Sequence, residues 1–334
     1  MKRGLFFLLS YCLISGLIAQ EVQWKEITTP VKASLRGLSP VSTTVCWASG
    51  SQGTWLKTMD GGESWEHGSI EGLDSLDFRA IHAWDDERAI VASAGSPAVV
   101  YKTSDGGKTW EKVHEEAEPA FFDALTFLSP NRGFLLGDPI DGTWMLLETY
   151  DGGDSWQRLP ISPPAAEGEA AFAASNSSLL VNRNILVFGT GGATSNLHLY
   201  SLNDQYWTLF QGPLLQGAFS QGIFGLSFVQ DGIVAVGGDF EKPDSRDRTA
   251  AVFKNQMAEL PNRFPSGYRS GIAYWKQKKL LIAVGPSGSD ISLDQGMNWE
   301  NFSATGFHAV KVSLDQKSIW ASGSQGRIGK LISK

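Results

Sequence analysis

Short apolar segments recur along the chain, and each recurrence has the same internal order. An apolar-x-small-apolar segment comes first, a strongly apolar segment that ends at glycine follows, and a third apolar segment leads into a polar turn. Short apolar segments bounded by glycine are typical of buried strands. The first segments are LRGL at Leu35, FRAI at Phe78, FDAL at Phe122, IFGL at Ile223 and FHAV at Phe307, with the near match YRSGI at Tyr268.

The polar turns share a box of the form x-D-G-G-x-S/T-W, which appears in KTMDGGESW, KTSDGGKTW and ETYDGGDSW, and as SLDQGMNW in a weaker copy. The boxes end at Trp65, Trp110, Trp156 and Trp299, and a degenerate copy, SLNDQYW, ends at Trp207. The distance from Trp207 to Trp299 is close to two periods, so one repeat has lost its box. Four short strands in each repeat of about 40–50 residues indicate the blades of a β-propeller.

The second segments occur seven times, which predicts seven blades. The last repeat begins at Phe307 and ends before any box, while the segment around Trp24 reads as a fourth strand without a blade. We therefore expect an all-β protein in which residues 20–334 form a single seven-bladed propeller of four-stranded blades. Residues 21–30 complete the seventh blade and close the ring, which leaves no sheet edge open.

Composition agrees with this architecture. The chain of 334 residues has 37 glycines and 12 tryptophans, and the boxes and strand ends account for many of both. Its net charge of −7 argues against a nucleic-acid partner, because such binding depends on neutralising phosphates. Cys46 lies in an apolar segment and is expected to be a buried thiol.

The first 19 residues differ from the rest. Lys2 and Arg3 precede an apolar run from Leu5 to Ile18, and the small residue Ala19 follows. This order is typical of a secretory signal peptide, and the run is too short for a stable membrane span. The sequence therefore predicts export to the periplasm or the extracellular space.

The side chains that recur in the boxes have structural explanations. The Asp accepts hydrogen bonds from amides of its own turn, the glycines adopt positive φ, and the Trp packs between blades with its N–H available to a turn carbonyl. These structural box residues are Asp60, Trp65, Asp105, Trp110, Asp151, Trp156, Asp294 and Trp299. We assign none of them, and no other residue, a catalytic role.

The first strand of each propeller blade lines the central channel, so the variable position of the first segment faces the channel. This position predicts a channel patch made of Arg36, Arg79, Asp123, Arg269 and His308. Guanidinium groups bind carboxylates and phosphates, which suggests a site for a carboxylate-bearing segment of a partner. The alternative is that the arginines pair with Asp123 or a neighbouring carboxylate and fill the channel.

The loops after the second strands form one rim of the ring. They supply the further candidates Gln52, Asp138, Asp141 and Glu169. Asp138 and Asp141 in GDPIDG could act as general acid and base, although aspartates beside glycine and proline are more typical of turns. The histidines lack metal-ligand spacing, and GTGGAT lacks the third glycine of a dinucleotide site, so we expect no metal and no cofactor.

The chain resembles the photosystem II stability/assembly factor family and its non-photosynthetic bacterial relatives. The resemblance rests on the Trp24 segment, the first segments at Arg36 and Arg79, the boxes that begin at Lys57 and Lys102, and GEAAFAAS at Gly168. It implies a non-catalytic propeller that binds a protein or peptide through a basic patch containing Arg36, Arg79 and Arg269, and we expect a monomer. An alternative is an Asp-box glycoside hydrolase, sialidase-like or xyloglucanase-like, or a carbohydrate-binding propeller. Three channel arginines and Tyr268 or Tyr274 could then serve as a sialidase-like arginine triad and nucleophile.

Overall fold

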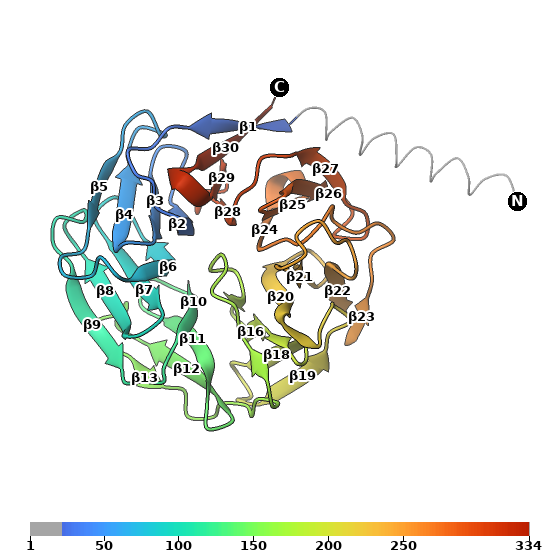
Figure 1. Cartoon of the computed structure of the whole chain (residues 1–334). Coiled ribbons are helices and arrows are strands. Elements are labelled where there is room, and N and C mark those ends of the chain that lie inside the picture. Colours follow the sequence, from blue (N-terminus) through green and yellow to red (C-terminus); the bar gives the residue numbers. More distant parts are fainter. Residues whose placement is uncertain (1–21, 334) are drawn as a thin grey trace, which may run out of the picture.

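The computed structural model describes residues 22–333, so the predicted signal peptide lies outside the described residues. Seven antiparallel sheets surround a central channel (Figure 1), which confirms the predicted seven-bladed propeller. Each blade has four main strands, and the first strand of each blade lies nearest the channel.

The strands of blades 1 to 3 follow one another without interruption. Blade 1 contains β2 (Leu35–Pro40), β3 (Cys46–Gly50), β4 (Thr54–Thr58) and β5 (Glu66–Ser69). Blade 2 contains β6 (Asp77–Ala83), β7 (Ala89–Ala94), β8 (Ala98–Thr103) and β9 (Glu111–Glu116). Blade 3 contains β10 (Phe122–Phe127), β11 (Gly133–Ile140), β12 (Thr143–Thr149) and β13 (Gln157–Arg158).

Blades 4 and 5 are joined by two short extra strands, β14 (Glu169–Ala170) and β17 (Gly191–Gly192). Blade 4 contains β15 (Leu179–Val181), β16 (Ile185–Gly189), β18 (Asn196–Ser201) and β19 (Trp207–Gln211). Blade 5 contains β20 (Ala218–Phe228), β21 (Ile233–Asp239), β22 (Ala250–Lys254) and β23 (Met257–Glu259). Because β14 pairs with β17 and β17 pairs with β20, the sheet of blade 5 has six strands.

The ring closes at blade 7. Blade 6 contains β24 (Gly271–Trp275), the 3-10 turn η1 (Lys276–Lys278), β25 (Leu280–Gly285), β26 (Gly288–Ser292) and β27 (Glu300–Ser303). Blade 7 contains β28 (Ala309–Val312), β29 (Ile319–Ser322), the 3-10 turn η2 (Ser324–Gly326), β30 (Ile328–Ser333) and β1 (Val22–Ile27). In the register of β1 against β30, Trp24 lies opposite Leu331, which confirms the predicted closure by the N-terminal strand.

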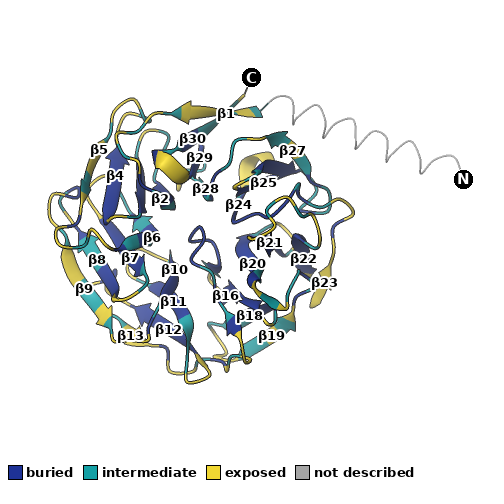
Figure 2. Ribbon diagram, in the orientation of Figure 1, coloured by how far each residue is buried: buried dark blue, intermediate teal, exposed yellow. Residues whose placement is uncertain are grey.

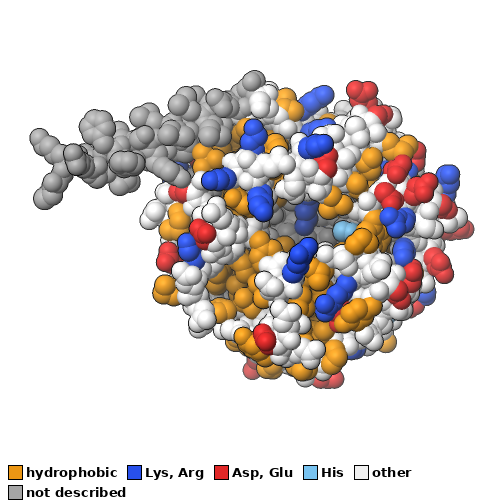
Figure 3. Space-filling view, turned by 180° about the vertical axis from the view of Figure 1, so that it is seen from behind, with side chains coloured by type: hydrophobic (Ala, Val, Ile, Leu, Met, Phe, Trp, Pro, Cys, Tyr) orange, Lys and Arg blue, Asp and Glu red, His pale blue; other side chains and the backbone are white. Residues whose placement is uncertain are grey.

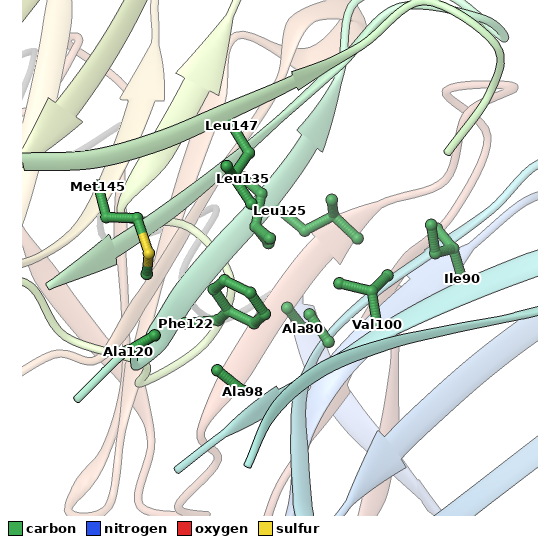
Figure 4. Close-up of a cluster of buried hydrophobic side chains, with 11 residues drawn as sticks. Ala80, Ile90, Ala98, Val100, Ala120, Phe122, Leu125, Leu135, Met145 and Leu147 are labelled. Atoms are coloured by element: carbon green, nitrogen blue, oxygen red, sulfur yellow. The ribbon is translucent and has the colours of Figure 1, made fainter. Parts of the chain in front are cut away.

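The core is a series of apolar clusters between neighbouring blades. Inner strands are buried almost throughout, whereas outer strands such as β9 and β23 are exposed (Figure 2). Between blades 2 and 3, Val100 packs with Phe122, Leu135 and Met145 (Figure 4). Cys46 is fully buried, and burial raises the pKa of its thiol, as expected for a packing residue.

Candidate functional site

Backbone hydrogen bonds fix which residue of each blade faces the channel. The amides of Leu35, Ile223, Arg269 and Phe307 each donate to a carbonyl at the end of the second strand of the preceding blade, at 3.0–3.1 Å. Three of these four residues are fully buried and apolar. The residue that follows each of them takes the channel-facing position: Arg36, Phe224, Ser270 and His308.

In four blades the first strand has a β-bulge at this position. The pairing of the first and second strands shifts register at Arg36, at Arg79, at Asp123 and at Phe224. A bulge leaves one residue unpaired and redirects its side chain. Because this residue does not take part in the strand pairing, its type can differ from one blade to the next.

A cavity of about 380 Å³ lies at the centre of the ring, on the rim that carries the loops after the second strands. On the face turned away in Figure 1, Lys and Arg side chains surround the central opening of the ring, with hydrophobic side chains between them (Figure 3). The lining residues are Arg36, Arg79, Phe172, Ala173, Ala174, Phe224, Phe240, Tyr268, Ser270, Pro286 and His308.

Arg36 is the cationic group that this cavity leaves without a carboxylate. Its Nη1 donates to the carbonyl of Ala174 at 3.0 Å, and no ion pair joins it to an acidic side chain within residues 22–333. Burial, and after it the charge of Arg79, lowers the pKa of Arg36 from its usual value. A desolvated guanidinium with unused donors is suited to a carboxylate supplied from outside.

Arg79 is the second cationic group in the wall. It forms an ion pair with Asp77 at 2.7 Å, and about a third of its side chain remains exposed. His308 completes the polar part of the cavity, and burial together with the charges of Arg36 and Arg79 lowers its pKa to about 3. His308 is therefore neutral at neutral pH, and the positive charge of the cavity comes from the two arginines.

The prediction that Arg269 belongs to the channel patch is wrong. Its side chain is fully buried and forms an ion pair with Asp290, whose side chain is also fully buried. It also donates to the carbonyl of Tyr268 and to the hydroxyl of Ser287. YRSGI holds one residue more than the other first segments, so Arg269 takes the buried position and Ser270 takes the channel position.

The prediction that Asp123 belongs to the patch is also wrong. Its side chain is buried, does not line the cavity, and has no hydrogen-bond partner for either carboxylate oxygen among the described residues. Burial, and then the nearby Asp138, raises its pKa well above the usual value, although Arg79 acts in the opposite direction. Within residues 22–333, neither arginine forms a hydrogen bond or an ion pair with Asp123.

The rim candidates do not converge on the cavity. Gln52 and Asp141 are exposed turn residues with φ of 63° and 51°, which fits the turn interpretation. Asp138 is partly buried and accepts a hydrogen bond from the amide of Ala171 at 3.0 Å. No two of these residues are placed as an acid–base pair.

Glu169 is buried and has a structural environment. It accepts hydrogen bonds from the side chains of Thr190, Asn196 and His198 at 2.6–2.9 Å, and from the amide of Ala166. Burial opposes ionisation of this carboxyl, but the hydrogen bonds outweigh it and lower the pKa to about 2. Glu169 therefore fixes the segment that leads into the channel.

The segment 172–178, which we call the channel plug, is the feature that the sequence did not reveal. It precedes β15 and reaches the centre of the ring (Figure 1). The plug hydrogen-bonds to all six other blades, through Arg36, Ile81, Leu125, Leu226, Ser270 and Lys311. Phe172 stacks on Phe224 with a centroid distance of 3.8 Å. The plug lies across the channel, and its first residues line the cavity.

The Asp boxes have the geometry expected of structural turns. In the first box, Asp60 accepts hydrogen bonds from the hydroxyl of Thr58 and from the amide and hydroxyl of Ser64, and these bonds lower its pKa. The boxes of Asp105, Asp151 and Asp294 repeat this arrangement.

The tryptophans of the boxes differ in one respect. Trp156 and Trp299 donate their indole N–H to a glycine carbonyl of the same box. The indole nitrogens of Trp65 and Trp110 have no partner among the described residues, so the expected bond is missing in these two turns.

The arginine triad needed for the sialidase-like alternative does not form, because Arg269 is buried in its ion pair. Tyr268 lines the cavity, but Tyr274 packs in the cluster between blades 5 and 6. Residues 22–333 contain no group of three or more acidic, His or Cys side chains that could hold a metal ion. Within the same range no helix has the length and hydropathy needed to cross a bilayer.

These features define the class: a seven-bladed propeller with Asp-box turns and a blind, arginine-lined cavity. Residues 17–120 match the family model described as photosynthesis system II assembly factor YCF48. This match agrees with the resemblance predicted from the sequence.

Solved structures of similar fold include two of YCF48 itself. The structure titled "YCF48 bound to D1 peptide" has a TM-score of 0.65 and 15% identity, and covers 93% of this chain and 95% of its own. The structure of YCF48 from Cyanidioschyzon merolae has a TM-score of 0.67 and 18% identity, and covers 92% of this chain and 98% of its own. The structure of U3-55K has a TM-score of 0.64 and 11% identity, and covers 93% of this chain and 98% of its own. It shows that other propellers share the fold. No curated protein sequence matches the chain.

Proposed function

We propose that the chain is a non-catalytic propeller that binds a peptide segment of a partner protein in the channel cavity and helps its assembly or stability. The observation that carries the proposal is Arg36, a desolvated guanidinium in the cavity wall with no carboxylate partner within residues 22–333. The similar fold of a YCF48 structure titled with a bound D1 peptide supports a peptide as the class of ligand.

The chemistry of the cavity suggests what the segment carries. Arg36 and Arg79 supply positive charge, while Phe172, Phe224 and Tyr268 supply an apolar wall. A segment with a carboxylate next to an apolar side chain satisfies both. Because the plug crosses the channel, the segment enters from the rim and does not thread through the ring.

The test uses two short peptides with the same apolar residues, one ending in a free carboxylate and one in an amide. Isothermal titration calorimetry should show saturable binding of the carboxylate form and at least about tenfold weaker binding of the amide, because a charge-assisted bidentate contact is lost. Equal affinities for the two forms would contradict the proposed role of the arginines.

The matched variants separate this cavity from general surface charge. Arg36→Ala/Arg79→Ala should abolish measurable binding and leave the unfolding temperature nearly unchanged. Arg183→Ala/Arg263→Ala removes two exposed arginines outside the cavity and should bind like the parent chain. If both double variants bind equally, the channel cavity is not the peptide site.

We also propose that residues 1–19 are a signal peptide, that the protein acts in the periplasm or outside the cell, and that it is a monomer. N-terminal sequencing of the protein from separated cell fractions should find a chain that begins near Gln20. Sedimentation should give a single species of about one chain mass. Assays with a sialoside and with xyloglucan oligosaccharides should show no turnover, and clear hydrolysis would overturn the non-catalytic assignment.

A further inference from the structure

Six of the seven junctions between blades hold a tryptophan at one equivalent register position. In blades 4 and 7 this residue lies directly opposite a third-strand residue, Trp207 opposite Tyr200 and Trp24 opposite Leu331. In blade 1, Glu66 lies opposite Lys57, which places Trp65 opposite Thr58. Blades 2, 3 and 6 follow the same register with Trp110, Trp156 and Trp299.

Each of these indoles packs in the cluster that its own blade shares with the preceding blade. Trp156 packs against the cluster of blades 2 and 3, Trp207 against that of blades 3 and 4, and Trp299 in that of blades 5 and 6. The indole is therefore the outer part of each junction, and it enters the junction from the outermost strand.

Blade 5 has no tryptophan at this position. Ala258 of β23 lies opposite Phe253 of β22, in the register that holds tryptophan in the other blades. The box is replaced by a two-residue turn, Asn255 and Gln256, with φ of 50° and 63°. Phe253 takes the place of the hydroxyl residue that organises the boxes, for example Thr58 of blade 1.

A hollow lies where the seventh indole is missing. It has a volume of about 480 Å³ and is lined from blade 4 by Ile185, Leu199 and Phe210, and from blade 5 by Phe228, Phe253 and Met257. This volume lies within the range of about 300–1,000 Å³ that small-ligand pockets have. We call this hollow the blade 4–5 groove. Truncation of a large packed side chain to alanine leaves an apolar space of this kind, and such spaces bind aromatic molecules.

We propose that the blade 4–5 groove binds the indole ring of a tryptophan from a partner polypeptide, in the place that an intramolecular tryptophan fills at the other six junctions. The six filled junctions show the shape and the direction of entry that suit this ligand. Every residue of β23 is exposed (Figure 2), so an extended segment can lie along the outside of blade 5 while its side chain enters. This second site is distinct from the channel cavity.

The first experiment measures binding of N-acetyltryptophanamide to the full chain by ligand-observed NMR and calorimetry. We expect one saturable site with a Kd on the order of 1 mM, as for a small ligand with few atoms. N-acetylleucinamide should bind at least about tenfold more weakly. Absence of saturable binding overturns the proposal, and so does binding of free indole without binding of N-acetyltryptophanamide.

Two variants on neighbouring positions of β23 test the location. Ala258→Trp restores the intramolecular indole and should reduce binding of N-acetyltryptophanamide more than about tenfold while raising the unfolding temperature. Glu259→Trp adds the same side chain on the opposite face of the strand and should leave binding unchanged. Equal behaviour of the two variants would show that the groove is not the site.

A third variant covers the case in which Ala258→Trp fails to fold. Leu199→Trp fills the groove from blade 4, and its matched control is Leu209→Trp, at a position that is 57% exposed and outside the groove. The Arg36→Ala/Arg79→Ala variant should keep its affinity for N-acetyltryptophanamide. A failure of the proposed peptide binding in the channel cavity can therefore be told apart from a failure of indole binding in the blade 4–5 groove. Self-association that disappears in Ala258→Trp would assign the groove to a second copy of the chain and overturn the proposal.

Discussion

Arg36 of blade 1 and Arg269 of blade 6 occupy similar places in sequence but opposite environments. Arg36 follows the buried residue Leu35 and lines the channel cavity, with no ion pair within residues 22–333. Arg269 takes the buried position itself and is neutralised by Asp290. A shift of one residue in register therefore decides whether an arginine belongs to a binding site or to the core.

The same contrast applies to the acidic side chains near the channel. Glu169 receives four hydrogen bonds and has a lowered pKa, whereas Asp123 receives none and has a raised pKa. Residue type alone does not reveal the role of a charged group in this ring. The role depends on which hydrogen-bond and ion-pair partners lie near each register position.

The largest expected effect is at Arg269. Arg269→Ala leaves Asp290 as a buried, unpaired charge and should lower the free energy of unfolding by about 3–5 kcal/mol. Thermal unfolding measured by calorimetry should show a Tm lower by on the order of 10 °C. Arg269→Leu/Asp290→Ala removes both charges and should recover most of the loss. A Tm unchanged in Arg269→Ala would show that the pair does not stabilise the fold.

Glu169 should show the next largest effect, and its sign depends on pH. Its pKa in the folded chain is about 2, below the ordinary value of 4.5, so its contribution is present above about pH 4.5 and is lost as the pH falls toward 2. Glu169→Gln should therefore reduce stability by about 2 kcal/mol at pH 7 and by much less near pH 2. Denaturant unfolding of both chains across this range checks the difference, and parallel curves would contradict it.

Salt provides a smaller test of the channel arginines. Raising NaCl from about 50 mM to about 500 mM should weaken binding of the carboxylate peptide a few-fold, because the cavity is open to solvent and exposed charge is screened. Calorimetry at several salt concentrations measures this slope. Arg36→Lys keeps the charge but not the planar fork, so it should keep the salt slope while binding more weakly.

The smallest expected effect is at Asp123. Its raised pKa means that its contribution to stability falls as the pH rises above the ordinary carboxyl pKa and stays low above its own raised pKa. Asp123→Asn, which cannot ionise, should raise Tm at pH 7 by about 1–2 °C and have no such benefit near pH 3. A lower Tm at pH 7 would indicate that the ionised carboxylate has a favourable partner.

Most of the fold could be predicted because the repeat is visible in the sequence. The boxes ending at Trp65, Trp110 and Trp156 set the period, and the segment around Trp24 revealed the closing strand. Only part of the site could be predicted. The repeat predicts that Arg36, Arg79 and His308 face the channel. It does not predict the buried position of Arg269, because the extra residue in YRSGI shifts the register.

The channel plug could not be predicted from the pattern for a related reason. The hydrogen bonds that residues 172–178 make at the centre of the ring go to other blades and not to a strand ladder. The burial of Asp123 without a hydrogen-bond partner could not be predicted either, because this residue lies at the same position of the first segment as Arg36 and Arg79. Long-range contacts of this kind have no local sequence signal.

The channel plug has a consequence for how the ring loses its structure. In an array where each unit contacts only its neighbours, units can unfold one after another from any weak junction. Here one segment of blade 4 hydrogen-bonds to each of the other six blades, so displacement of any blade removes a bond at the centre. The plug thus couples distant blades directly, and the propeller should unfold in a single cooperative transition and not blade by blade.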